Sequence, residues 1–143
     1  MKHLLPLAAL VGLVSLTGCS TQIGVDNPDN NAASWSAGTL STTYKSDVST
    51  LFAATKRALD GMRDVGIVGR TGETPERSEL GELTGVVVYA RALGDVQVRV
   101  SISKAIDANS GNDCTQVDVR WGVAGNAQQS QQVIHRITQN LGR

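Results

Sequence analysis

The sequence predicts an α+β two-layer sandwich, in which an antiparallel sheet of about four to five strands carries two helices on one face. Two segments with helical periodicity flank a series of segments that alternate apolar and polar residues, and turn-forming residues separate those segments. The composition agrees with a small aliphatic core, because 41% of the residues are hydrophobic but only 3% are aromatic.

The first predicted helix covers residues 47–64. Ser46 or Asp47 is suited to cap its start, and Gly66 to end it in a left-handed conformation. Apolar side chains recur at steps of three and four residues, which places them on one helical face: Val48, Leu51, Phe52, Thr55, Ala58, Leu59 and Met62.

Four strands are predicted at residues 67–71, 82–92, 95–104 and 115–123, and a weaker pattern over 35–43 is consistent with one more. The alternation of apolar and polar residues is clearest in the segments 95–104 and 115–123. One face is expected to be buried and to carry Val96, Val98, Val100, Ile102, Val117, Val119, Trp121 and Val123.

The second predicted helix covers residues 126–141, with Gly142 beyond its end. Its apolar face consists of Ser130, Val133, Ile134, Ile137 and Leu141. One core is expected between the two helices and the sheet, and four residues are assigned to it: Leu51, Leu59, Val119 and Ile137.

Residues 1–18 have the features of a cleaved export signal. A basic start, Met1-Lys2-His3, precedes an apolar run over residues 4–16 that is too short to span a bilayer. The segment Leu16-Thr17-Gly18-Cys19 resembles the lipobox of bacterial lipoproteins, in which the cysteine thiol accepts a diacylglyceryl group and becomes the first mature residue. The alternative is an ordinary secretory signal that contains a stray cysteine.

The lipobox resemblance implies that Cys19 carries two or three acyl chains, which is enough for stable attachment to a membrane. In Gram-negative lipoproteins an aspartate after this cysteine marks retention at the inner membrane. Here the residue is Ser20. The resemblance therefore implies the periplasmic leaflet of the outer membrane. Residues 19–34 are rich in Asn, Asp and Ser, which predicts a flexible tether before a single domain over 35–143.

The mature chain also resembles a family of small bacterial lipoproteins known only as a domain of unknown function. The resemblance rests on Tyr44, on the helical segment 48–59, and on the segment 119–126 leading through Ser130 into Ile134 and Ile137. It implies a fold and no activity. Asn126 stands where an aspartate is expected in relatives, and either side chain can cap a helix.

The sequence shows no catalytic or metal-binding arrangement, and no cofactor is expected. His135 is expected on the outer part of a helix, and Cys114 to be buried, inert, or paired between chains. Asp107, Asn109 and Asp113 around Gly111 weakly resemble a calcium loop, but a hairpin turn is favoured because strands flank them.

The best candidate for a binding surface is the solvent face of the sheet. Strand parity is expected to bring together Tyr89, Arg91, Gln97, Arg99, Asp118 and Arg120. The arginines are suited to hold a carboxylate or phosphate, unless Asp118 simply pairs with Arg99 or Arg120 across the strands.

These patterns favour a non-enzymatic binding or assembly module, held on the membrane by Cys19, whose partner is an envelope protein or an envelope glycan. A hydrolase acting on envelope material is the alternative. The 13 basic residues balance 13 acidic ones, which argues against a nucleic-acid partner.

Overall fold

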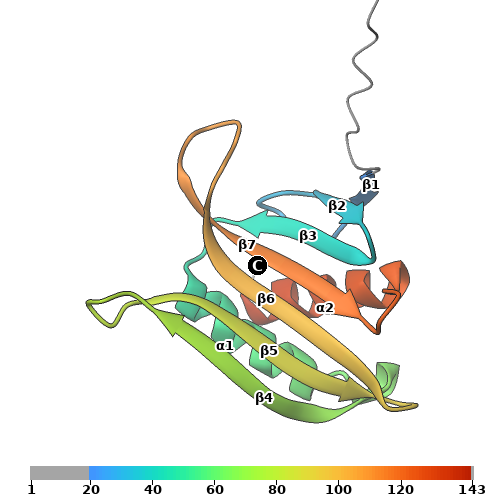
Figure 1. The fold of residues 1–143 in the computed structure, drawn as a ribbon. Coiled ribbons are helices and arrows are strands. Elements are labelled where there is room, and N and C mark those ends of the chain that lie inside the picture. Colours follow the sequence, from blue (N-terminus) through green and yellow to red (C-terminus); the bar gives the residue numbers. More distant parts are fainter. Residues whose placement is uncertain (1–19, 143) are drawn as a thin grey trace, which may run out of the picture.

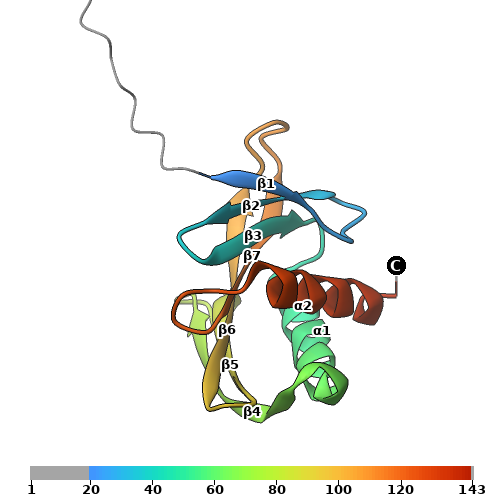
Figure 2. The ribbon, with the colours of Figure 1, turned by 90° about the vertical axis from the view of Figure 1, so that its right-hand side faces the viewer.

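A computed structural model describes residues 20–142, which form a sheet of seven antiparallel strands with two helices packed together on one of its faces (Figures 1 and 2). The predicted signal over residues 1–18 and the lipidated Cys19 lie outside the described residues. The strands are β1 (Thr21–Gly24), β2 (Ala32–Ser36), β3 (Thr39–Tyr44), β4 (Ile67–Arg77), β5 (Leu83–Ala92), β6 (Val96–Ile106) and β7 (Asp113–Trp121), and the helices are α1 (Val48–Asp60), the short 3-10 helix η1 (Arg63–Val65) and α2 (Ala127–Asn140).

The strand order is β1-β2-β3-β7-β6-β5-β4. The α+β class is confirmed, but the predicted count of four to five strands is too low. The additional strands are at the β1 edge. At the other edge, β4 runs to Arg77 and not to residue 71, because an exposed edge strand with three register shifts needs no apolar alternation.

The central strands alternate as predicted. Val98, Val100 and Ile102 of β6 are almost fully buried, as are Val117 and Val119 of β7. The expectation for Val123 is wrong, because β7 ends at Trp121 and Gly122, at φ +79°, turns the chain away from the sheet. Val123 is 93% exposed.

Both helices are capped by the expected side chains. Asp47 accepts a hydrogen bond from the backbone N–H of Thr50, and Asn126 accepts one from Gln129. The first helix ends at Gly61, earlier than predicted, and Gly66 in its left-handed conformation closes η1 instead. The four residues assigned to one core, Leu51, Leu59, Val119 and Ile137, have no exposed surface.

The predicted tether over residues 19–34 is wrong for the described part of that segment. Residues 21–24 and 32–36 are strands, and the loop between them is fastened to β3. Asn27 is 2% exposed, and its Nδ2 donates to Thr42 Oγ1 at 3.1 Å and to the Thr43 carbonyl at 2.9 Å. The polar composition that suggested disorder supplies these hydrogen bonds.

Tyr44 joins the sheet to α2. Its side chain is 1% exposed, and its hydroxyl lies 2.9 Å from Thr138 Oγ1. Burial raises the pKa of Tyr44 to about 12, although the hydrogen bond with Thr138 opposes part of this shift. The neutral phenol is therefore the form that the fold stabilises.

We expect Asn27→Ala to lower the free energy of unfolding by about 1–3 kcal/mol, because the Thr42 hydroxyl and the Thr43 carbonyl lose a buried donor. Urea unfolding measures the change. Asn31→Ala is the matched control, since Asn31 is an exposed asparagine of the same loop and no side-chain hydrogen bond joins it to the described residues. Equal stability of the two variants would contradict the role given to Asn27.

We expect stability to fall as the pH rises from about 10 to about 12, the interval in which the unfolded chain releases the Tyr44 proton and the folded chain keeps it. Below that interval both states hold the proton, so the contribution is complete. The slope from this group approaches about 1.4 kcal/mol per pH unit. Tyr44→Phe should flatten the dependence of the free energy of unfolding on pH, measured by chemical unfolding. Tyr89→Phe leaves the buried Tyr44 in place and should therefore retain the wild-type slope.

Candidate functional site

The open face of the sheet carries the six residues predicted to share it. Tyr89 lies opposite Arg99 across β5 and β6, and Arg99 lies opposite Arg120 across β6 and β7. The pairs next to this row are Arg91 with Gln97, and Ser101 with Asp118. The strand registers therefore place two arginines directly opposite each other.

Arg120 is committed to the fold. Its guanidinium donates to the Ala37 carbonyl at 2.6 Å, to Thr39 Oγ1 at 3.3 Å and, through its other nitrogen, to the Val123 carbonyl. Ala37 lies in the turn between β2 and β3, and Val123 in the loop between β7 and α2. Arg120 thus clamps two turns together, a role that the sequence pattern did not indicate.

Arg91 and Arg99, the other two arginines of the open face, differ in whether their side chains have a partner. Arg91 forms an ion pair with Asp95 in the turn that follows its own strand, and both side chains are largely exposed. Arg99 is also exposed and forms no side-chain hydrogen bond or ion pair with any residue the structure describes. Its fork of donors is available to a ligand.

Asp118 does not neutralise the arginines. Its carboxylate accepts a hydrogen bond from Gln116 Nε2 at 2.9 Å, and within residues 20–142 it forms no ion pair with Arg99 or Arg120. The alternative of a simple cross-strand ion pair is therefore not what the structure shows. Like charges directly opposite each other destabilise a sheet.

A shallow hollow of about 270 Å³ lies beside this row, lined by Gln97, Arg99, Arg120, Gly122 and Val123. The last two residues were assigned to a strand from the sequence, but the structure places them in the loop after β7. A bidentate pair between Arg99 and a carboxylate or phosphate fits its chemistry.

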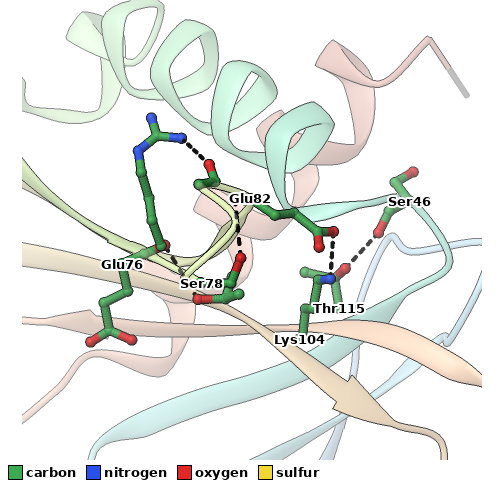
Figure 3. Close-up of polar contacts among 9 residues, drawn as sticks. Ser46, Glu76, Ser78, Glu82, Lys104 and Thr115 are labelled. Atoms are coloured by element: carbon green, nitrogen blue, oxygen red, sulfur yellow. Dashed lines mark hydrogen bonds and ion pairs between the residues drawn. The ribbon is translucent and has the colours of Figure 1, made fainter.

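A second hollow, of about 390 Å³, lies where α1 begins, near the ends of β6 and β7. Figure 3 shows its polar groups engaged with one another: Lys104 Nζ contacts Glu82 Oε1 at 2.6 Å, and Thr115 Oγ1 donates to the Ser46 carbonyl at 2.7 Å. Cys114 also lines it, and burial raises the pKa of this half-buried thiol, with Asp107 and Asp113 adding to the effect. A raised pKa keeps the thiol protonated and unreactive at neutral pH.

A third hollow, of about 420 Å³, crosses the open face between β1 and β7. Its lining side chains are small or uncharged and include Gln22, Asn30, Ser34, Ser41, Thr43, Asn109 and Gln116. The sequence did not reveal it, because four of its lining residues, Gln22, Asn30, Ala32 and Ser34, lie in the segment that was predicted to be a tether.

His135 lies on α2, as predicted, and its Nδ1 is 2.6 Å from Asp26 Oδ2. A histidine paired with a carboxylate supplies two of the three residues of a catalytic triad, and the third is a nucleophile. Among residues 20–142 no Ser, Thr or Cys side chain hydrogen-bonds His135. The pair instead ties α2 to the loop between β1 and β2.

The segment with Asp107, Asn109 and Asp113 is the predicted hairpin turn between β6 and β7. Asp107 Oδ1 accepts from the Asn109 N–H at 2.8 Å, which lowers the pKa of Asp107, and the Asp107 carbonyl accepts from the Gly111 N–H at 2.8 Å. Within residues 20–142 no cluster of three or more His, Cys, Asp or Glu side chains is arranged to hold a metal ion.

None of the helices formed by residues 20–142 is both long and apolar enough to cross a membrane. A comparison with curated proteins finds no match to the chain. A family model described as "Protein of unknown function (DUF3568)" matches residues 2–140, nearly the whole sequence. The chain therefore belongs to the DUF3568 family.

Proposed function

We propose that this protein is a lipid-anchored, non-enzymatic binding module of the bacterial cell envelope, and that the open face of its sheet holds an anionic group of an envelope protein or glycan. The observation that carries the binding proposal is the position of Arg99: it faces Arg120 across two strands, beside a hollow, with no partner among the described residues. Arginines in such positions hold carboxylates or phosphates by paired hydrogen bonds.

The anchoring proposal rests on the sequence around Cys19. Residues 16–19 resemble a lipobox, which implies that Cys19 carries acyl chains. Two or more such chains hold a protein on a membrane stably. Ser20 directs the protein to the periplasmic leaflet of the outer membrane by the sorting pattern of such lipoproteins. Ser20 is exposed in the structure, so it is accessible to the sorting machinery.

Binding is favoured over hydrolysis because of how the polar groups are used. In the hollow beside the start of α1, Lys104 and Glu82 are paired with each other, and the histidine beside Asp26 has no nucleophile as a hydrogen-bond partner among residues 20–142. A hydrolase acting on envelope material needs an activated nucleophile within reach of a base. Arg99 needs only an anion.

We expect Cys19→Ser to prevent acylation and to leave unprocessed or mislocalised precursor, because the modification requires a thiol. Mass spectrometry of the native protein should show an N-terminal Cys19 heavier by its acyl chains. An unmodified Cys19 in the native protein would refute the anchor.

Fractionation of the two membranes tests the sorting part of the same proposal. Wild-type protein should be recovered with the outer membrane, and Ser20→Asp should shift it to the inner membrane while leaving its acylation unchanged. Recovery of both proteins with the outer membrane would contradict the sorting role of Ser20.

We expect Arg99→Lys to lower recovery of the partner by about tenfold in a crosslinking pull-down from intact cells, because lysine keeps the charge but loses the paired donors. Arg63→Lys is the matched control, since Arg63 is also exposed and has no side-chain partner among the described residues, but lies in η1 away from the open face. Arg120 is left unchanged, because replacing it would open the clamp. Wild-type recovery from Arg99→Lys would remove this face from the proposal.

A further inference from the structure

The first strand leaves almost no chain between the proposed anchor and the folded domain. β1 begins at Thr21, and the two residue steps back to Cys19 span at most about 7 Å. A lipid on Cys19 therefore holds the domain directly against the leaflet, and one end of the sheet must face it.

The strand registers identify that end. Thr21 lies opposite Trp35, so β1 starts at the end of the sheet where the turn at Ala37 and Gly38 joins β2 to β3. Arg120 clamps this turn to the loop over residues 122–125, and the turn between β5 and β6 lies at the same end of the sheet. In Figure 1 this end is on the right, and Figure 2 looks directly onto it. We call residues 36–38, 93–95 and 122–125 the anchor end.

The anchor end is apolar where it is most exposed. Val123 is 93% exposed and Leu93 is 71% exposed, and the segments 36–38 and 122–125 contain no charged residue. Asp95, the charged residue in 93–95, is paired with Arg91. Exposed apolar side chains beside a lipid anchor lose their contact with water when they enter the interfacial region of a bilayer.

The opposite end of the sheet has a different character. Its turns, residues 78–82 and 107–112, form what we call the hairpin end, on the left of Figure 1. Leu80 and Ile106 are exposed there by 96% and 70%, but Glu79, Asp107 and Asp113 lie close to them in the sequence, in addition to Glu82, which is paired with Lys104. A surface of anionic lipid repels such a cluster.

We propose that the anchor end is a membrane-docking surface, with Val123 and Leu93 seated in the interfacial region of the leaflet that holds the acyl chains. This inference rests on the proposed lipidation of Cys19 and adds the orientation of the domain. The sheet then stands on the membrane with its strands directed away from it, which leaves the hairpin end pointing into the surrounding compartment.

The test uses the native acylated protein with Cys114→Ser, reconstituted in vesicles of phosphatidylethanolamine and phosphatidylglycerol. Single cysteines replace Val123 or Leu93 at the anchor end, and Leu80 or Ile106 at the hairpin end. All four positions are at least 70% exposed, so a thiol-reactive nitrobenzoxadiazole label is tolerated equally. Lipids with a nitroxide near the headgroup quench labels that lie within roughly 10 Å of the interface.

The expected result is blue-shifted emission and at least roughly twofold stronger quenching at Val123 and Leu93 than at Leu80 and Ile106. Equal quenching at the two ends, stronger quenching at the hairpin end, or no quenching at any site would overturn the docking surface, even with acylation intact. Mass spectrometry of the same samples separates this from failure of the anchor itself: a mass without acyl chains would overturn both proposals.

Discussion

The fork of hydrogen bonds from Arg120 is the interaction on which the arrangement of the open face depends. One side chain holds the carbonyls of Ala37 and Val123, which belong to turns 86 positions apart in the sequence. A guanidinium presents its donors in a rigid plane, so it fixes the separation of the two turns as well as their proximity. The clamp also occupies one of the two opposed arginines and leaves Arg99 as the free cation of that cross-strand pair.

The same clamp links the proposed binding site to the proposed docking surface. Gly122 and Val123 line the hollow beside Arg99, and Val123 is also the most exposed apolar residue of the anchor end. If the anchor end meets the membrane, the hollow opens close to the lipid surface. A partner that binds there approaches from the side of the domain, along the open face of the sheet.

A second set of contacts explains why a segment of disordered character is ordered. Asn27 and Asn30 donate to β3 residues, and Asp26 contacts His135 of α2. Such a segment buries little apolar surface, so hydrogen bonds to groups already fixed by the sheet must offset the entropy of ordering it. Because this segment is ordered, the folded domain begins at β1, two residues after the proposed anchor at Cys19.

The sequence by itself determined the elements whose signals are local. The alternation of Val98, Val100 and Ile102, the apolar face of α1 and the caps Asp47 and Asn126 each depend on neighbours in the chain, and the structure places them as predicted. The alternation of side chains along each strand also placed Arg99 and Arg120 on one face of the sheet. Only the tertiary structure decided the partners: β2 becomes a strand because β3 offers it an edge, and β1 then pairs with β2. Arg120 bonds carbonyls where an ion pair with Asp118 was equally consistent with the sequence. Residue types state what a side chain can bind, but which group lies within reach depends on the register and the turns that bring distant segments together.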